Sequence, residues 1–135
     1  KRVIEDKTPI LGICLGMQLL TNSSEEGIEE GLGWIEGQSL KFVYDHLKVP
    51  HMGWNSIEIH KESPLFESTK KHRKYYFVHS YHVHCKHERD ILATSEYGID
   101  FNSMVKKNNI YGAQFHPEKS HKYGMEILNQ YAKIV

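Results

Sequence analysis

One cysteine in this sequence stands where nucleophilic chemistry could be done. Cys14 lies between Gly12 and Gly16, directly after an apolar run and directly before a helix-forming stretch. This is the G-x-nucleophile-x-G elbow pattern with cysteine in place of serine, in which a strand ends abruptly and a helix begins at the nucleophile. The free N–H groups and the positive dipole end of that helix favour the reactive thiolate. Taken alone, the pattern also fits a small buried cysteine that follows a strand.

A second motif offers this cysteine a base. His116 follows an apolar segment and is succeeded by Pro117 and Glu118 at the start of the last helical stretch. A histidine can deprotonate a thiol, and a carboxylate two residues later can orient the imidazole and stabilise its charged form. Such partners meet only in the fold, so their wide separation in sequence is no obstacle. Cys14, His116 and Glu118 therefore form a candidate catalytic triad, although the second motif alone also fits an ordinary acidic helix start.

The elements that must position these residues follow from the hydrophobic pattern. Strands are predicted over residues 9–13, 39–44, 54–59, 75–79, 91–96, 101–107 and 110–115. The last two flank Asn108-Asn109, a pair that tolerates positive φ and favours a tight hairpin. From Pro117 onward, apolar residues recur at helical spacing. The sequence therefore predicts an α/β domain with an inserted antiparallel portion.

Composition limits the class of protein. The chain has 135 residues, of which 39% are hydrophobic and 25% charged, which suits one packed domain over residues 1–135. Lysine plus arginine balances aspartate plus glutamate at 17 each, so no electrostatic footprint for nucleic acid exists. Cys14 and Cys85 are too few for a disulfide framework, which suits the reducing cytoplasm. No apolar run approaches the roughly 20 residues of a membrane span.

Four separated motifs together resemble a known family. They are PILGICLGMQ (9–18), VPHMGWN (49–55), YFVHSY (76–81) and HPE (116–118). The first and last are similar to class I, triad-type glutamine amidotransferases, and the middle two resemble the glutaminase subunits of imidazole glycerol phosphate synthases in histidine biosynthesis. The resemblance implies a flavodoxin-like α/β fold with a mixed sheet and a nucleophile elbow. Because the elbow comes so early, we expect the N-terminal strands of that fold to be missing from the chain.

The resemblance also implies a mechanism. Cys14 attacks the side-chain carboxamide of glutamine and forms a thioester, which water then hydrolyses to glutamate. His116 serves as base and acid, and Glu118 orients it. The N–H of Leu15 supplies one oxyanion donor. The second donor comes in this family from an upstream glycine-containing loop, which the 135 residues do not contain, so we expect low activity from this chain alone.

Further site residues and partners follow from the same resemblance. The substrate-binding residues that it implies are Gly16, Gln18, Ser80 and Tyr81. The residues that it implies at or beside the partner interface are Met52, Trp54 and Asn55. The partner is a cyclase (synthase) subunit with a (β/α)8-barrel, which forms a heterodimer with the glutaminase and receives its ammonia. Trp54 would fit the hydrophobic core equally well. No cofactor and no metal are implied.

Three alternatives stay open. A cluster of potential zinc or copper ligands consists of His79, His82, His84, Cys85 and His87. Strand alternation argues against this metal site, because it sends His82 and His84 to one face and His79 and Cys85 to the other. A paralogous amidotransferase for bacterial surface sugars would share the motifs, and the bulky Trp34 favours it mildly. The third alternative is a catalytically impaired fragment that binds a partner.

Overall fold

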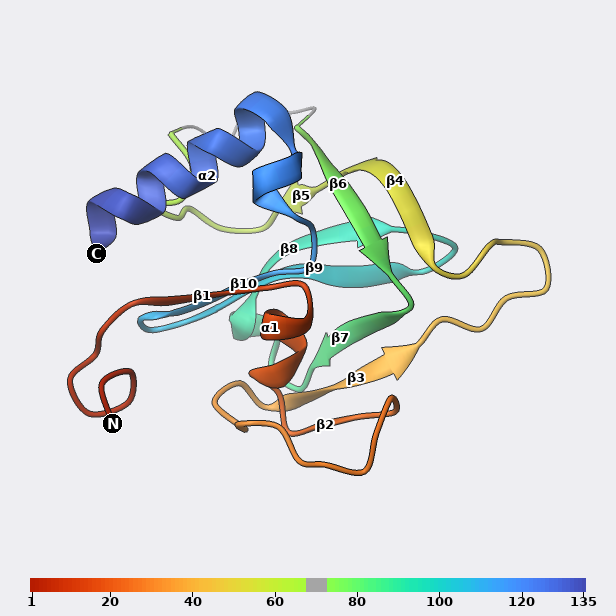
Figure 1. The fold of residues 1–135 in the computed structure, drawn as a ribbon, viewed down its shortest axis with the longest axis horizontal. Coiled ribbons are helices and arrows are strands. Elements are labelled where there is room, and N and C mark those ends of the chain that lie inside the picture. Colours follow the sequence, from red (N-terminus) through yellow and green to blue (C-terminus); the bar gives the residue numbers. More distant parts are fainter. Residues whose placement is uncertain (68–72) are drawn as a thin grey trace.

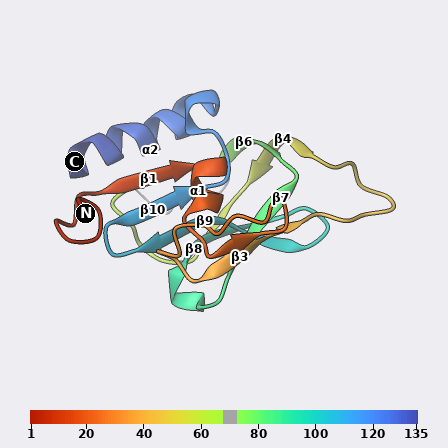
Figure 2. The ribbon, with the colours of Figure 1, turned by 60° about the horizontal axis from the view of Figure 1, so that its bottom comes forward.

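A curled, mixed β-sheet with one α-helix on each face forms the body of the molecule (Figures 1 and 2). The computed structural model describes residues 1–67 and 73–135. Its strands are β1 (Ile10–Ile13), β2 (Ser23–Ser24), β3 (Gly37–Lys41), β4 (His51–Ser56), β5 (Glu58–Ile59), β6 (Lys74–His79), β7 (Tyr81–Cys85), β8 (Ile91–Glu96), β9 (Asp100–Lys107) and β10 (Ile110–Ala113). Its helices are α1 (Leu15–Leu19), α2 (His121–Ile134) and the 3-10 turns Glu88–Asp90 and Pro117–Lys119.

The main sheet has the strand order β1-β10-β9-β7-β3-β2, and β8 joins β9 to β5. β1 runs parallel to β10, with Ile13 opposite Ala113, as the short parallel strand before the elbow predicts. β10 returns antiparallel to β9, with Ile110 opposite Lys107. The two-residue turn between them places Asn108 at φ +55°, a conformation that asparagine tolerates better than most residues. The predicted hairpin is therefore present at the predicted position.

A separate ribbon of two strands, β4 and β6, stands beside the main sheet (Figure 1). The two strands are antiparallel, and their register runs from His51 opposite His79 to Ser56 opposite Lys74. The prediction of one continuous strand over 54–59 is wrong, because β4 pairs with β6 whereas β5 pairs with β8. The chain changes its pairing partner at Ile57, and local alternation in sequence carries no signal for such a change.

The two faces of the sheet bury two hydrophobic clusters. On one face Met17 and Leu20, from α1 and its end, pack with Ile35, Val83 and Val105. On the other face α2 contributes Ile127, Tyr131 and Ile134, which pack with aromatic side chains such as Phe77 and Phe115. Their spacing of three and four residues places them on one side of the helix, as the sequence pattern predicts. Burial of a large apolar side chain contributes about 1.5–3 kcal/mol to folding.

Close approach of the backbone explains one of the two elbow glycines. A Cβ added to Gly12 would lie 2.6 Å from the carbonyl oxygen of Gly16, whereas a Cβ on Gly16 would meet nothing within 4 Å. The turn therefore excludes a side chain at Gly12 but has room for one at Gly16. Within the described part of the chain, no helix combines the length and apolarity needed to cross a membrane.

Candidate active site

Cys14 occupies the sharp turn between β1 and α1. Its backbone adopts φ +54° and ψ −108°, a combination that residues other than glycine rarely take and that recurs at functional sites. The N–H of Cys14 donates to the carbonyl oxygen of Ala113 at 2.8 Å, so the turn begins directly from the parallel pairing of β1 with β10. This is the geometry that the glycine-flanked cysteine predicts.

The sulfur of Cys14 is partly buried among polar groups. Its Sγ lies 3.8 Å from the carbonyl oxygen of Val78, to which the thiol donates, and 3.7 Å from Nε2 of Gln114, which donates to the sulfur. Burial raises the pKa of the Cys14 thiol, and this effect outweighs the hydrogen bonds from the Leu15 N–H and from Gln114, which lower it. The N–H of Leu15 at the helix start does favour the thiolate, as expected, but burial of the sulfur has the larger effect on the pKa. The thiol needs a base.

His116 and Glu118 form a pair at the end of the strand beside β1. Nδ1 of His116 lies 2.6 Å from Oε1 of Glu118. When this nitrogen donates to the carboxylate, Nε2 is left as the proton acceptor. The side chain of His116 is 20% exposed and that of Glu118 is 46% exposed. The sulfur of Cys14 makes its hydrogen bonds with Val78 and Gln114 rather than with His116, which is common for catalytic groups before substrate binds.

Strand β6 connects the two halves of the candidate triad. The N–H of His116 donates to the carbonyl oxygen of Tyr76 at 2.9 Å. The hydroxyl of Ser120 accepts from the N–H of Tyr76 at 2.9 Å and donates to the carbonyl oxygen of His116 at 2.6 Å. Two residues further along the same strand, Val78 contacts the sulfur of Cys14. One strand therefore holds the turn that carries the candidate base and also contacts the candidate nucleophile.

A pocket of about 350 Å³ opens beside the sulfur, a size that suits a small molecule. Its walls are Cys14, Leu15, Gln18, Glu26, Pro50, Val78, His79, Ser80 and Tyr81. Three of the four predicted substrate-binding residues and the predicted oxyanion donor are among them, and Gly16 is not. The side chain of Gln18 is mostly buried, and its Nε2 donates to Tyr81 O and to Gln114 Oε1, each at 3.2 Å.

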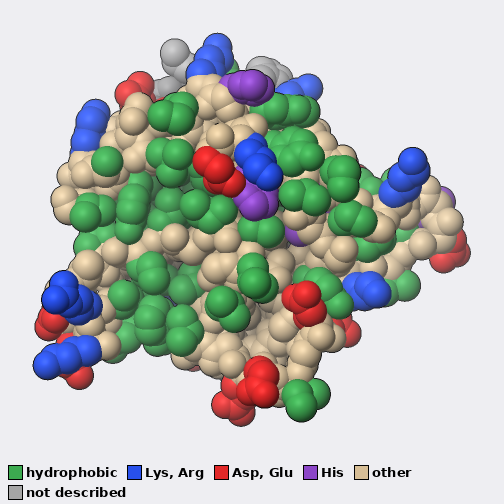
Figure 3. Space-filling view, viewed as in Figure 1, with side chains coloured by type: hydrophobic (Ala, Val, Ile, Leu, Met, Phe, Trp, Pro, Cys, Tyr) green, Lys and Arg blue, Asp and Glu red, His purple; other side chains and the backbone are tan. Residues whose placement is uncertain are grey.

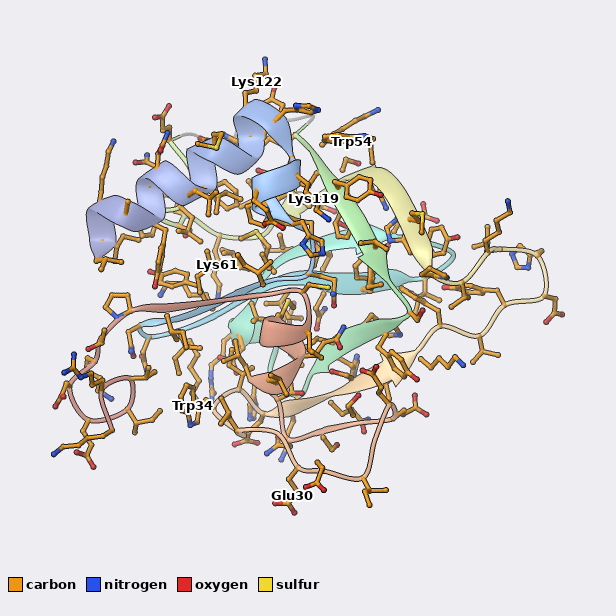
Figure 4. The ribbon with its side chains drawn as sticks, in the orientation of Figure 1. Glu30, Trp34, Trp54, Lys61, Lys119 and Lys122 are labelled. Atoms are coloured by element: carbon orange, nitrogen blue, oxygen red, sulfur yellow. The ribbon has the colours of Figure 1, made fainter. Side chains whose placement is uncertain are left out.

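Glu26 is the one charged residue of this pocket wall, and the sequence interpretation missed it. Its backbone N–H donates to the hydroxyl of Ser24 at 3.1 Å, which shapes the loop that carries it. Acidic side chains gather over this loop at the bottom of the face seen in Figure 3, and Glu30 of the same loop is labelled in Figure 4. The run Ser23-Ser24-Glu25-Glu26 after the elbow helix was the available signal. A carboxylate here suits a ligand that carries an ammonium group.

The predicted interface residues differ in their surroundings. Met52 and Trp54 are 62% and 47% exposed on β4, so Trp54 is not a core residue. The indole of Trp54 stacks on the ring of His121 with centroids 5.1 Å apart (Trp54 is labelled in Figure 4). Asn55 turns inward, where its Nδ2 donates to the carbonyl oxygen of Glu96 at 2.8 Å. Its side chain is therefore committed to contacts within the chain.

The histidine-rich segment forms no metal cluster in the described residues, 1–67 and 73–135. Strand alternation does not extend across the segment, because β6 ends at His79 and β7 begins at Tyr81. The rings of His79 and His82 consequently lie near the same ring, that of Phe42, at centroid distances of 5.3 and 4.7 Å. The prediction that His79 and His82 point to opposite faces is therefore wrong.

Two buried histidines, His51 and His79, are joined by a hydrogen bond that fixes the tautomer of each neutral ring. Nδ1 of His79 donates to the carbonyl oxygen of Tyr81 at 2.7 Å, so its Nε2 is free to accept from Nδ1 of His51 at 3.0 Å. Nε2 of His51 then accepts from Nδ2 of Asn55 at 3.4 Å. A proton added to either ring would place two N–H groups face to face. Burial lowers the pKa of His51 to about 4 and that of His79 to about 3.

This pair predicts a pH-dependent stability. Because the folded pKa values of His51 and His79 lie below the usual value of 6.5, the unfolded chain binds more protons as the pH falls. The free energy of unfolding therefore keeps the full contribution of the two neutral rings above pH 6.5. It falls as the pH drops toward the folded pKa values of about 4 and 3, by about 1.4 kcal/mol per pH unit for each ring. Urea denaturation between pH 6.5 and 5 measures this slope.

Two glutamine variants distinguish the effect of these rings on the pH dependence of stability from the effect of other titrating groups. His79→Gln should make the slope shallower, whereas replacing the exposed His84 by glutamine should leave it unchanged. Equal slopes for His79→Gln and the parent protein would contradict the neutral pair.

A cysteine at a strand-to-helix turn, a histidine–carboxylate pair and a pocket beside the sulfur, all on a mixed α/β sheet, are typical of the class of enzymes that use a cysteine nucleophile. The chain belongs to the family described as "Glutamine amidotransferase class-I", whose model matches residues 1–134. Over 134 residues it is 51% identical to a protein of Methanococcus maripaludis named imidazole glycerol phosphate synthase subunit HisH 2. It is 45% identical over 136 residues to imidazole glycerol phosphate synthase subunit HisH of Leptospira borgpetersenii.

These alignments cover nearly the whole of this chain and about two thirds of each relative. The covered shares are 98% of this chain in both cases, and 66% and 67% of the two relatives. Among solved structures, a glutamine amidotransferase from Thermotoga maritima superposes with a TM-score of 0.62 at 17% identity, over 98% of this chain and 50% of that one. The superposition confirms the fold class.

Proposed function

We propose that the protein is the glutaminase subunit of an imidazole glycerol phosphate synthase, which hydrolyses glutamine to glutamate and passes ammonia to a cyclase subunit. The observation that carries this proposal is the sulfur of Cys14 at the wall of a small-molecule pocket that also contains Gln18, Glu26 and Tyr81. The similarity to HisH subunits supports the histidine pathway in particular.

The triad geometry supports a two-step hydrolysis. Nε2 of His116 takes the proton of the Cys14 thiol, and the sulfur attacks the carboxamide carbon of glutamine. The N–H of Leu15 donates to the oxyanion that forms, as expected for the residue after an elbow nucleophile. The C–N bond breaks as His116 returns the proton to the leaving ammonia. His116 then activates water, which attacks the thioester, and glutamate leaves as the thiol is restored.

The exposed face of β4 supports docking of a partner subunit. Met52 lies opposite Val78, and Trp54 lies opposite Tyr76, in the ribbon that contacts both Cys14 and His116. Exposed methionine and tryptophan are typical of interface cores. Figure 4 shows Lys119 and Lys122 near Trp54 at the same end of the molecule, which suits a partner with an acidic rim. We propose a heterodimer with a (β/α)8-barrel cyclase subunit on this face, in the cytoplasm.

A paralogous amidotransferase for bacterial surface sugars is the second candidate. The bulk of Trp34, which favoured it in the sequence, is explained by packing. The indole of Trp34 packs against the cluster that contains Met17 and Ile35, on the face of the sheet covered by α1. Trp34 is absent from the walls of the Cys14 pocket. Its bulk therefore serves the core and gives no information about the acceptor of ammonia.

Complementation tests the pathway. In a histidine auxotroph that lacks its glutaminase subunit but keeps its cyclase subunit, expression of the full-length form of this protein should restore growth without histidine. Failure despite good expression would contradict the histidine pathway. If purified protein still released glutamate from glutamine, the sugar pathway would be favoured. If it released none with any barrel partner, the chain would be a partner-binding fragment.

Glu26 should affect binding of glutamine more than the chemistry. Glu26→Gln removes the negative charge that faces the pocket and is expected to raise KM for glutamine about tenfold, with kcat changed less than threefold, because a charge-assisted hydrogen bond to an ammonium group becomes a weaker, uncharged one. Steady-state glutamate release measures both constants. Glu30→Gln, on the same loop but outside the pocket wall, is the control. A KM that rises equally in both variants would contradict a specific contact.

A further inference from the structure

Gln114 is a buried side chain that no part of the proposed mechanism uses. It follows β10 directly, two residues before His116, and it is 0% exposed. Its Nε2 lies 3.7 Å from the sulfur of Cys14. Its backbone N–H donates to the carbonyl oxygen of Ser103 at 2.9 Å, which anchors the residue to β9. A buried carboxamide that contacts a nucleophilic sulfur needs an explanation.

The orientation of this carboxamide is fixed by a chain of hydrogen bonds that begins at the pocket wall. The carbonyl oxygen of Tyr81 can only accept, so the group of Gln18 that lies 3.2 Å from it must be its NH2. The same NH2 lies 3.2 Å from the carboxamide of Gln114, which must therefore present its oxygen to Gln18. Gln114 is left to present its own NH2 to the sulfur. The backbone carbonyl of Tyr81 therefore suffices to fix the orientations of the Gln18 and Gln114 carboxamides.

We propose that Gln114 is a catalytic residue that donates a hydrogen bond to the Cys14 thiolate, and that Gln18 is a positioning residue that locks this donor toward the sulfur. The inference rests on the proposed function of Cys14 as the nucleophile. When His116 removes the thiol proton, the sulfur can no longer donate a hydrogen bond to the carbonyl oxygen of Val78, and it gains negative charge. The Gln114 NH2 keeps its protons and stabilises that charge together with the Leu15 N–H.

The physical need for such a donor is the burial of the sulfur. Burial raises the pKa of the Cys14 thiol, whereas the hydrogen bond from Gln114 opposes that rise. Glu118 and Glu26 are the carboxylates that also raise the pKa. Donors that need no reorientation when charge develops are worth more in a buried site than in water.

Alkylation of Cys14 by iodoacetamide tests the inference without glutamine or a cyclase partner. The rate is measured against pH and resolved by peptide mass, so that Cys14 is distinguished from Cys85, whose thiol pKa is raised to about 12 mainly by burial. In Gln114→Met the alkylation rate of Cys14 at pH 7 should fall about tenfold and its pH midpoint should rise, because a hydrogen bond to a charged group is lost. In glutamine hydrolysis kcat should fall by a similar factor while KM stays within twofold.

Three further variants keep the test decisive. Gln114→Glu has nearly the same shape and should raise the pH midpoint at least as much, so it replaces Gln114→Met if that variant does not fold. Gln18→Met should shift the midpoint in the same direction by a smaller amount. Gln38→Met, at an exposed glutamine of β3, should change nothing. An unshifted midpoint in folded Gln114→Met or Gln114→Glu would overturn the inference. If the Gln114 variants shift the pH midpoint but the parent protein does not hydrolyse glutamine, the proposed function would be overturned and the role of Gln114 beside the sulfur would stand.

Discussion

Replacing Cys14 by serine is expected to reduce glutamine hydrolysis by at least about 10,000-fold, because loss of the nucleophile disables the whole triad. Serine preserves the shape of the side chain and the polar contacts around Sγ. The hydroxyl of serine, however, ionises far less readily than the thiol, so the histidine that can deprotonate a thiol activates a hydroxyl poorly. The folded structure and its free energy of unfolding should change by less than about 0.5 kcal/mol.

Release of glutamate in the presence of the proposed cyclase partner measures the effect, with urea denaturation as the check on folding. Cys85→Ala is the matched control, since Cys85 is a buried thiol that belongs to the hydrophobic cluster on the α1 face. It should lose some stability and keep its hydrolytic rate. A Cys14→Ser variant that retained one tenth of the parent activity would contradict the assignment of the nucleophile.

Gly124→Ala should destabilise the protein by about 2–4 kcal/mol, although alanine is the better helix former by roughly 1 kcal/mol. Gly124 lies in the first turns of α2, where the helix passes over Pro117. An added Cβ would lie 1.8 Å from the carbonyl oxygen of Pro117 and 2.9 Å from Cβ of Ser120. The clash is with backbone, so the turn that carries His116 and Glu118 must move.

This displacement should lower the catalytic rate as well as the stability. Urea denaturation gives the first effect and kcat for glutamate release gives the second. Gly27→Ala is the control, because a Cβ at Gly27 would meet nothing within 4 Å, and it should change stability by less than about 0.5 kcal/mol. A Gly124→Ala variant at least as stable as the parent protein would show that α2 and the turn can separate at little cost.

Much of the fold was predictable because it depends on local periodicity. The parallel strand before Cys14, the hairpin at Asn108-Asn109 and the final helix all lie where the sequence pattern places them. The partition of residues 51–59 between two strand pairs was not predictable, because β4 and β5 find their partners far away in the chain. The inward turn of Asn55 has the same origin, since its acceptor belongs to Glu96.

The candidate site shows a similar division. Cys14, His116 and Glu118 could be selected from residue types and motif spacing alone, and they remain a prediction until the variants above are assayed. Glu26 and Gln114 carried only weak signals, because an acidic loop and a glutamine in a strand segment are common. Their proximity to the sulfur depends on the loop after α1 and on the pairing of β1 with β10.

The sequence by itself determined the family, the turn that carries the candidate nucleophile and the residues able to serve it as base and orienter, because these follow from short motifs and periodicity. Only the tertiary structure decided how the sulfur is solvated. It places Cys14 against the Val78 carbonyl and the Gln114 carboxamide and raises the pKa of the thiol through burial. Solvation and hydrogen bonding of the sulfur depend on three strands that are distant in sequence, and only their packing brings those groups within contact distance.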